Sequence, residues 1–270
     1  MKLLKFTLIV LLLFPVVVVA QLKTGAERTE VYLPKLQNKR VAICGNQTSK
    51  IGNIHLIDTL FRLNINIVYI FAPEHGFRGD AEAGAHIQSD VDQKTGIPVV
   101  SLYGNTKKPT KEQMQNIDIL IFDIQDVGCR FYTYISTLHY IMEAAAENHV
   151  KVLILDRPNP NGYFVDGPVL EEKYKSFVGM HPIPVVHGMT IGEYGKMINE
   201  EKWLKDSLQC DLEIITMKGY DHKMRYSLPY PPSPNLKTDE SIYLYPTLCF
   251  FEGTAVSLGR GTAIPFQVFG

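Results

Sequence analysis

Cysteine is scarce in this sequence, and it forms no recognisable pattern. The 270 residues contain four cysteines, which are spaced too widely for a CxxC redox motif or a zinc-binding pair. Cys44 and Cys249 lie in apolar runs, where we expect buried thiols. Cys129 and Cys210 complete the set. The cysteines therefore predict neither a metal centre nor a redox motif.

An excess of positive charge is also missing, as are the common nucleotide and hydrolase motifs. Lysine and arginine number 27 against 28 acidic residues, so the net charge of −1 provides no basic surface for nucleic acid. No G-x-G-x-x-G follows the first predicted strand, no Walker lysine loop is present, and no G-x-S-x-G marks a serine hydrolase. We therefore expect no cofactor and no nucleic-acid partner.

The first twenty residues have the pattern of a signal peptide. Lys2 and Lys5 precede an apolar stretch over 6–19, and the residues up to Ala20 provide a cleavage site before Gln21. The stretch falls short of the ~20 apolar residues that span a bilayer; an uncleaved membrane anchor is the alternative. We expect an exported protein, periplasmic or extracellular, with the leader removed near Ala20 and no stable membrane anchor afterwards.

The sequence does contain a series of short apolar runs bounded by turn residues. Such runs, rich in Ile, Val and Leu, are typical of strands buried on both faces of a sheet. They cover residues 40–44, 65–71, 97–103, 117–122 and 151–155. Helical patterns alternate with them, over 55–64, after a capping box at Thr110 and Gln113, over 132–148, and after a capping box at Thr190 and Glu193. This alternation predicts an α/β fold with a Rossmann-like, doubly wound parallel sheet.

The alternation loosens beyond residue 158. Residues 211–218 alternate like a strand, whereas the prolines of 229–235 forbid regular structure. We place a Rossmann-like catalytic lobe at 21–205 and a second, α+β lobe at 206–270. Because the chain stops at PFQVFG without the signs of a natural C-terminus, we expect this second lobe to be incomplete.

Polar side chains follow four of the predicted strands, at the point where each strand ends. They are Asn46; Glu74 and His75; Asp123, Gln125, Asp126, Arg130 and Tyr132; and Asp156, Arg157 and Asn159. Asp and Asn are common in turns for local reasons, but the carboxyl ends of parallel strands share one edge, where open α/β sheets bind ligands. Acids, amides, arginines and an aromatic ring suit a sugar substrate.

The same segments resemble the exo-β-N-acetylmuramidase family. The matching motifs are FAPEHGFRGD, TGIPVVSLYG, FDIQDVGCRFYTYISTLHYIMEAAAE, LDRPNPNG, SFVGMHPIPVVHGMTIGE, PSPN and FEGTAVSLGRGTAIPF, spread from about residue 38 to 270. The resemblance implies an exported enzyme that removes N-acetylmuramic acid from the non-reducing end of peptidoglycan fragments, either a disaccharide or a short glycan. It also implies a Rossmann-like lobe and a second lobe with the active cleft between them.

The resemblance also implies roles for individual residues. The family's catalytic glutamate falls on Glu74, in the PEHG motif. The matching motifs also bring Asp123, Asp126, Arg130, Tyr132, His187, Glu252 and Arg260 to the cleft. Family chains continue past residue 270, so part of the cleft wall is expected to be missing here.

Glycoside hydrolysis needs an acid for the leaving oxygen and usually a second carboxylate. We predict Glu74 as the acid and Asp126 as its partner, with Asp123 and Glu252 as further candidates. The substrate's own 2-acetamido oxygen is an alternative to a second carboxylate. The lactyl carboxylate of N-acetylmuramic acid suits a guanidinium, for which the candidates are Arg130, Arg157 and Arg260.

Two other classes of protein fit part of these observations. An exported muropeptide- or sugar-binding protein would share the leader, the lobes and the polar cleft, but would need no catalytic acid. A metal-dependent hydrolase would use His75 and His187 with the aspartates, although their spacing matches no metal motif such as H-E-x-x-H. We expect no metal.

Overall fold

The computed structural model describes residues 22–78, 90–104 and 106–270. The predicted signal peptide, residues 1–20, lies outside these described residues. Within them, no helix combines the length and the apolar character needed to cross a bilayer.

A single seven-stranded sheet organises the chain, in the order β5-β6-β4-β1-β7-β8-β9. All neighbouring pairs are parallel except β5–β6 at one edge, which is antiparallel. The strands are β1 (Val41–Gly45), β4 (Ile67–Ala72), β5 (Asp90–Val91), β6 (Pro98–Ser101), β7 (Ile119–Asp123), β8 (Lys151–Leu155) and β9 (Leu212–Ile215). A separate hairpin pairs β2 (Lys50–Ile51) with β3 (Ile54–His55). The five predicted apolar strands and the strand predicted in 211–218 are confirmed.

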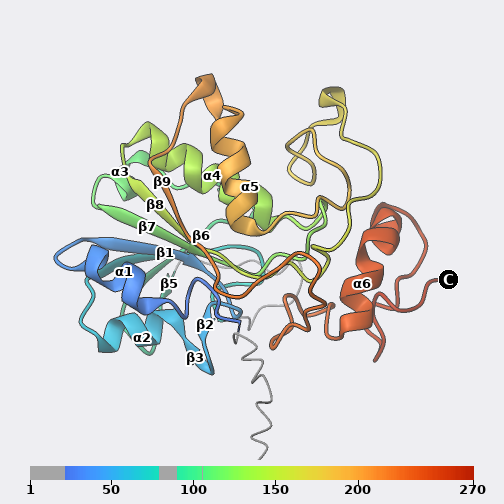
Figure 1. Ribbon diagram of the computed structural model, residues 1–270, viewed down its shortest axis with the longest axis horizontal. Helices are drawn as coiled ribbons and strands as arrows, with labels where there is room; N and C mark the ends of the chain where they lie inside the picture. The colour runs from blue at the N-terminus through green and yellow to red at the C-terminus, as the bar shows by residue number, and fades with distance from the viewer. Residues whose placement is uncertain (1–21, 79–89, 105) are drawn as a thin grey trace, which may run out of the picture.

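Helices cover both faces of this sheet, as the doubly wound prediction requires. They are α1 (Thr29–Leu36), α2 (Leu56–Arg62), α3 (Lys111–Met114), α4 (Tyr134–Glu147), α5 (Ile191–Glu200) and α6 (Asp239–Leu248), with 3₁₀ turns η1 (Glu172–Tyr174), η2 (Lys205–Ser207) and η3 (Cys249–Gly253). Helices α4 and α5 lie above the sheet in Figure 1, and α1 and α2 lie below it. The predicted capping boxes at the starts of α3 and α5 are both formed, and a third begins α6.

The apolar strands divide their side chains between two hydrophobic cores because successive residues of a strand point to opposite faces. In β7, Leu120 and Phe122 pack with α4 and α5, whereas Ile121 packs in the core that contains α1 and α2. All five residues of β7 are buried. This double burial explains why the central strands read as continuous apolar runs.

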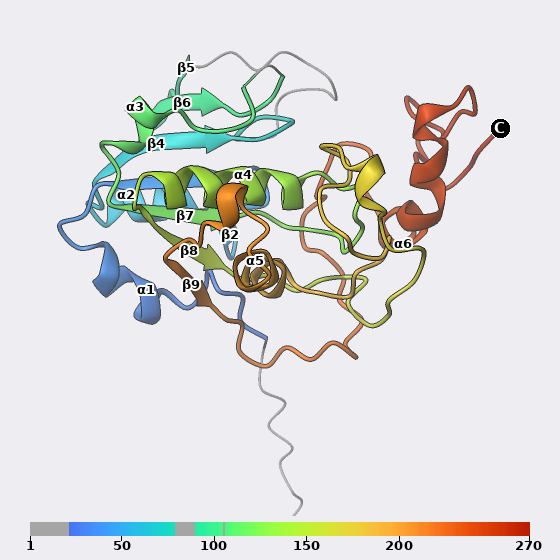
Figure 2. The ribbon, with the colours of Figure 1, turned by 90° about the horizontal axis from the view of Figure 1, so that it is seen from above.

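The C-terminal part of the chain first adds strand β9 to the sheet and then runs away from the sheet. Strand β9 lies past residue 205, the expected boundary of the first lobe, and pairs with β8. Helix α6 lies apart from the sheet, beyond the carboxyl ends of the strands (Figure 2). Cys249, directly after α6, has its sulfur 3.9 Å from that of Cys129, and all four cysteines are buried and free. Buried apolar and sulfur contacts therefore join the α6 region to the loop after β7.

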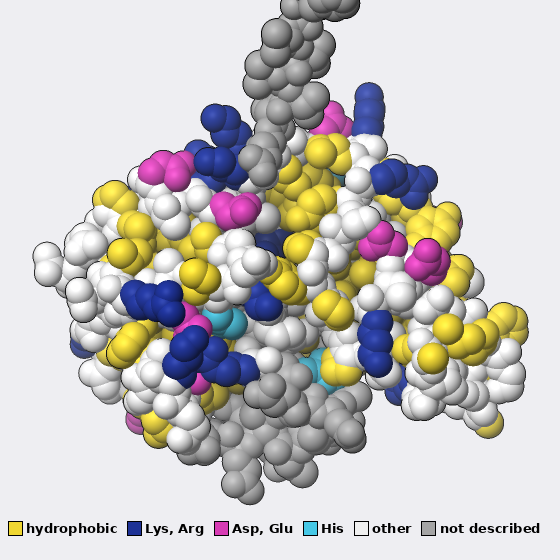
Figure 3. Space-filling model, turned by 90° about the horizontal axis from the view of Figure 1, so that it is seen from below, with side chains coloured by type: hydrophobic (Ala, Val, Ile, Leu, Met, Phe, Trp, Pro, Cys, Tyr) yellow, Lys and Arg dark blue, Asp and Glu magenta, His cyan; other side chains and the backbone are white. Residues whose placement is uncertain are grey.

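The surface view from below shows charged side chains of both signs mixed over the face (Figure 3). Hydrophobic side chains gather at the right-hand end of that view, where the C-terminal segment lies. The large exposed hydrophobic side chains of this segment are Tyr243, Phe250, Ile264, Val268 and Phe269.

Candidate active site

A cavity of about 1030 Å³ lies between the carboxyl edge of the sheet and the C-terminal segment. One wall follows β4, β6 and β7, and the other is formed by residues 233–266. The residues that line it are Glu74, His75, Tyr103, Gly104, Lys107, Phe131, Tyr132, Thr133, Tyr134, Phe177, Val178, Ser233, Asn235, Leu236, Tyr245, Cys249, Phe250, Glu252, Gly253, Arg260 and Phe266. Aromatic rings and a few charged groups thus surround a space large enough for a sugar.

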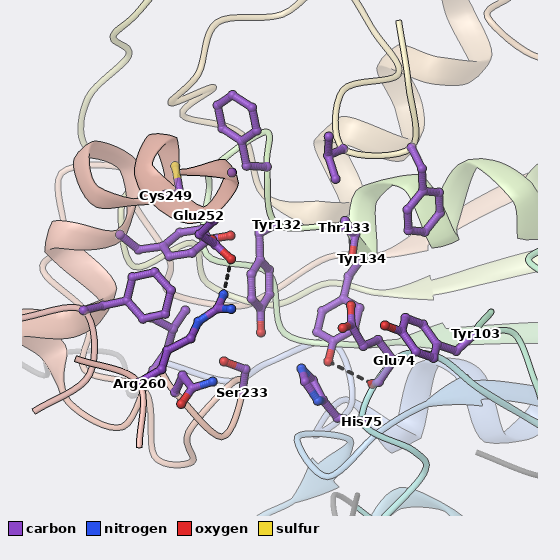
Figure 4. Close-up of a pocket in the computed structure, with 18 of the residues that line it drawn as sticks. Glu74, His75, Tyr103, Tyr132, Thr133, Tyr134, Ser233, Cys249, Glu252 and Arg260 are labelled. Carbon is purple, nitrogen blue, oxygen red and sulfur yellow. Dashed lines mark hydrogen bonds and ion pairs between the residues drawn. The ribbon is translucent and has the colours of Figure 1, made fainter. Parts of the chain in front are cut away.

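A tight turn after β4 presents Glu74 to this cavity. The amide of Gly76 donates a hydrogen bond to the carbonyl of Pro73 at 3.1 Å, which closes the turn. His75 has φ of 70°, a left-handed conformation that costs free energy for a residue with a side chain. The Tyr134 hydroxyl donates to the Glu74 carbonyl at 3.4 Å. The surrounding structure therefore holds Glu74 in place through its backbone (Figure 4).

His75 is nearly buried beside Glu74, with 9% of its surface exposed. Burial lowers the pKa of His75, and the neighbouring Glu74 carboxylate opposes that effect only in part. The imidazole is therefore neutral near pH 7. Its Nδ1 atom has no hydrogen-bond partner within the described residues. A neutral ring with an open nitrogen at a cavity wall suits a hydroxyl or amide of a ligand.

Three tyrosines line the cavity near Glu74: Tyr132 and Tyr134 on the side toward Glu252, and Tyr103 on the far side of Glu74 (Figure 4). The Tyr132 hydroxyl donates to the carbonyl of Pro232 at 2.7 Å and so joins the loop after β7 to the proline-rich segment. The rings of Tyr132 and Tyr134 meet edge to face at 4.9 Å. Burial and then the Glu74 carboxylate raise the pKa of Tyr103. Burial also raises the pKa of Tyr132 and of Tyr134, so all three phenols remain protonated at neutral pH.

The opposite wall carries an ion pair between Glu252 and Arg260 (Figure 4). Burial raises the pKa of Glu252, and the Arg260 guanidinium acts in the opposite direction. The Arg260 guanidinium also lies 5.4 Å from the centroid of the Phe266 ring. Glu252 and Glu74 are the two carboxylates among the lining residues.

The other predicted site residues follow the same edge of the sheet but do not line the cavity. Asp123 is fully buried and binds Arg157 through two hydrogen bonds of 2.6 and 2.9 Å. Arg157 also donates to the carbonyl of Lys50 at 3.2 Å. This buried pair is internal, so neither group faces a ligand in this cavity.

Asp126, predicted as the second catalytic carboxylate, is 3% exposed. Its Oδ2 atom accepts a hydrogen bond from the Gly128 amide at 2.7 Å and lies 3.4 Å from Nε2 of His187. Nδ1 of His187 in turn accepts from the Met189 amide at 3.2 Å. Asp126 Oδ1 and His187 Nε2 have no hydrogen-bond partner within the described residues. The His187 amide, which donates to the Gly128 carbonyl at 3.2 Å, joins the turn after β7 to the segment before α5.

Asp156 and Asn159 support the start of α5 in a similar way. The Asp156 carboxylate accepts from the Gly192 amide at 2.8 Å and from the Thr190 hydroxyl at 3.0 Å. Burial raises its pKa from 3.8 to about 6, against the effect of these donors. Asn159 donates to the carbonyl of Met189 at 2.9 Å.

The remaining predicted residues also form internal contacts. Asn46 is fully buried, and its side-chain oxygen Oδ1 accepts from the hydroxyl of Thr48 at 2.6 Å. Gln125 donates to the carbonyls of Asp126 at 2.8 Å and Pro158 at 2.6 Å. Arg130 donates to the carbonyls of Pro168 and Ile183. These side chains hold the loops that surround the cavity.

Several lining residues were not predicted, although most lie inside the motifs that carry the family resemblance. Tyr103 lies in the SLYG motif, Tyr134 ends FYTY, and Ser233 and Asn235 belong to PSPN. Lys107 falls between two motifs, and nothing in its local sequence distinguishes it from Lys108. Within the described residues, no group of three or more His, Cys, Asp or Glu side chains is arranged to hold a metal ion.

The sequence matches protein families and relatives of known activity. Residues 41–240 match the family described as "Exo-beta-N-acetylmuramidase NamZ, N-terminal", and residues 243–270 match its C-terminal counterpart. The peptidoglycan beta-N-acetylmuramidase NamZ of Bacillus subtilis is 47% identical over 88% of this chain and 58% of its own length. The chain thus spans little more than half of that curated relative.

Two solved structures of DUF1343 family proteins from Bacteroides fragilis have the same fold. One is 54% identical with a TM-score of 0.85, and covers 93% of this chain and 67% of its own. The other is 42% identical with a TM-score of 0.84, and covers 92% and 65%. The match of one family over most of the sequence, with a relative at 47% identity, is decisive. The chain belongs to the exo-β-N-acetylmuramidase NamZ family.

Proposed function

We propose that this protein hydrolyses the glycosidic bond of a β-linked N-acetylmuramic acid at the non-reducing end of a peptidoglycan fragment, a disaccharide or a short glycan. Membership of the family and the 47% identical Bacillus subtilis relative, named as a peptidoglycan beta-N-acetylmuramidase, support the reaction. The role in the cell is then turnover or recycling of the cell wall.

The observation that carries this proposal is the pair of carboxylates on facing walls of one aromatic cavity. Glu74 lies on the sheet wall and Glu252 on the wall formed by the C-terminal segment (Figure 4). Most glycosidases place an acid on one side of the scissile bond and a second carboxylate, as base or nucleophile, across from it. The tyrosine and phenylalanine rings between them provide the flat apolar surfaces on which sugar rings pack.

In this proposal Glu74 is the general acid, because a rigid turn holds it at the end of a buried strand. Glu252 replaces Asp126 as the partner carboxylate, since Asp126 is turned toward Gly128 and His187 and does not line the cavity. Arg260 keeps Glu252 oriented through their ion pair. The neutral His75 ring binds a hydroxyl or the acetamido group of the sugar.

The experiment is an assay of the purified protein with a chromogenic aryl N-acetyl-β-muramide and with the corresponding N-acetyl-β-glucosaminide. We expect release of the aryl group from the muramide, and an unchanged rate in EDTA. Proton NMR of the first sugar released shows whether the anomeric configuration is retained or inverted. Binding of muropeptides without any release would contradict the proposal and favour a binding protein. Loss of activity in EDTA would favour a metal-dependent hydrolase.

We also propose that the protein is exported, on the strength of the charged and apolar pattern of residues 1–20. Mass spectrometry of the protein recovered outside the cytoplasm is expected to find Gln21 as the first residue. Recovery of the intact N-terminus in the cytoplasm would contradict export.

A further inference from the structure

Two adjacent lysines after β6 lie in opposite environments. Lys108 contacts Glu143 and Glu147, each at 2.7 Å, and so belongs to an ion-pair cluster with α4. Lys107 lines the cavity instead, and its ammonium lies 4.2 Å from the centroid of the Phe177 ring. No carboxylate among the described residues forms an ion pair with Lys107. The ammonium therefore keeps hydrogen-bonding capacity for a ligand.

The Phe177 ring beside Lys107 is fixed by contacts with α4. The Ser136 hydroxyl donates to the carbonyl of Phe177 at 2.6 Å, which joins the residue to α4. The ring of Phe177 stacks with that of Tyr140 at 6.2 Å between centroids and 14° between planes. Val178, the next residue, also lines the cavity and is 48% exposed. A cation thus lies beside a fixed apolar surface.

The other cationic side chains considered for the substrate carboxylate are engaged elsewhere. Arg157 binds Asp123, and Arg130 donates to backbone carbonyls, both away from the cavity. Arg260 lines the cavity but pairs with Glu252. The cavity is lined by two cationic side chains, Lys107 and Arg260. Of these two, Lys107 has no acidic partner within the described residues.

We propose that Lys107 and Phe177 recognise the 3-O-lactyl group of N-acetylmuramic acid, an assignment that rests on the proposed function. The lactyl group carries a carboxylate and a methyl group on one carbon. The ammonium of Lys107 pairs with the carboxylate by a charge-assisted hydrogen bond, and the rings and methyls of Phe177 and Val178 cover the lactyl methyl. N-acetylglucosamine lacks this group. Lys107 is thus a residue that determines specificity, and it takes no part in bond cleavage.

The test compares an aryl N-acetyl-β-muramide with the same glycoside whose lactyl carboxylate is converted to the uncharged carboxamide. A charge-assisted hydrogen bond contributes about 1.5–3 kcal/mol, so the wild type is expected to favour the acid by about 10- to 100-fold in kcat/KM. Lys107→Ala is expected to abolish most of this preference, mainly through KM for the acid, while the rate on the carboxamide changes little. Lys107→Arg retains most of the preference because the charge remains.

Lys108→Ala is the matched control, since it removes the same charge from the next residue but outside the cavity. It is expected to leave the preference for the acid unchanged. A third substrate, the muramoyl-L-alanine glycoside, moves the carboxylate outward along a peptide. If Lys107→Ala loses rate on that substrate but not on the free acid, the lysine reads a peptide carboxylate and the lactyl assignment is wrong.

The assignment is overturned if Lys107→Ala keeps the wild-type ratio of acid to carboxamide. That outcome leaves the proposed hydrolysis intact, because the wild type still cleaves the muramide. A wild-type protein that cleaves neither glycoside contradicts the proposed function itself, and the lactyl assignment with it.

Discussion

Acidic side chains follow three strands at the same edge of the sheet, but some of them are buried in internal contacts and one faces the cavity. Asp126 and Asp156, after β7 and β8, are buried and accept hydrogen bonds from backbone amides, Asp126 from Gly128 in the same turn and Asp156 from Gly192 at the start of α5. Glu74, after β4, is half-buried, and its carboxylate lines the cavity. Position at the carboxyl end of a parallel strand is therefore not enough to place a residue in the site.

The difference comes from what covers each loop. The turn after β7 is hydrogen-bonded to the segment before α5 through the Gly128 carbonyl and the His187 amide. The Thr190 hydroxyl and the Gly192 amide, at the start of α5, bind Asp156 directly. The turn after β4 faces the C-terminal segment across open space. A buried carboxylate must find donors within the protein, whereas one at a cavity wall remains available to a ligand. Internal hydrogen bonds thus separate structural acids from catalytic ones.

The largest expected effect is on Glu74. Because loss of a general acid typically costs about 10²–10⁴ in rate, Glu74→Gln is expected to lose nearly all activity on a natural disaccharide. It should lose much less on an aryl glycoside whose leaving group needs no proton. Asp126→Asn is the matched control at the same edge, and its kcat on the disaccharide should stay within a few-fold of wild type.

Steady-state kinetics on both substrates checks this comparison. Equal impairment of Glu74→Gln on the two substrates would make Glu74 a nucleophile or a group that orients the acetamide. A dead Asp126→Asn protein that folds normally would restore Asp126 to the catalytic machinery, and the separation between structural and catalytic acids would not hold.

The second effect is on stability, at the buried pair of Asp123 and Arg157. Asp123→Ala leaves the Arg157 guanidinium buried without its partner, which typically costs about 3–5 kcal/mol in unfolding free energy. Asp118→Ala is the control. Asp118 directly precedes the same strand, β7, and forms an ion pair with Arg40 in which both side chains are partly exposed. Urea denaturation should show a much smaller loss for the control. Equal losses would contradict the structural role of the buried pair.

The smallest effect concerns the pH dependence of stability through Asp156. The folded protein keeps this proton up to about pH 6, whereas the ordinary carboxyl value is 3.8. The folded state therefore binds more protons between these values, and the unfolding free energy from this group falls as pH rises from about 4 to about 6. The total fall is up to about 3 kcal/mol for a shift of roughly two pKa units.

Asp156→Asn keeps an acceptor for the Gly192 amide but does not titrate. Urea denaturation from pH 4 to pH 7 gives the difference in unfolding free energy between wild type and variant. This difference isolates the contribution of Asp156, because the other titratable groups contribute equally to both proteins. The wild type should lose stability relative to the variant as pH rises. A constant difference would show that Asp156 titrates normally in the fold.

Local patterns predicted the elements of this fold well. The strands follow from continuous apolar runs, and α3 and α5 follow from capping boxes whose partners are three residues apart. The prediction did not include α1 and α6, each of which contains a proline. In α6 the capping box at Thr238 and the packing of Ile242 and Tyr245 in the core outweigh Pro246. Tertiary contacts of this kind are not visible in a local window.

The sequence by itself indicated the buried strands and the Pro-Glu-His-Gly turn after β4, because apolar runs and turn residues are local patterns. The pairing of the strands joins segments far apart in the sequence, such as β1 with β7. Only the tertiary structure decided which polar groups face the cavity. Asp123 forms an ion pair with an arginine 34 residues away in the sequence, and the Tyr132 hydroxyl donates a hydrogen bond to a carbonyl 100 residues away. Lys108 pairs with acids of α4, whereas its neighbour Lys107 lies over the Phe177 ring in the cavity. Such pairings arise when distant segments pack together, since hydrogen bonds and ion pairs act only over a few ångströms.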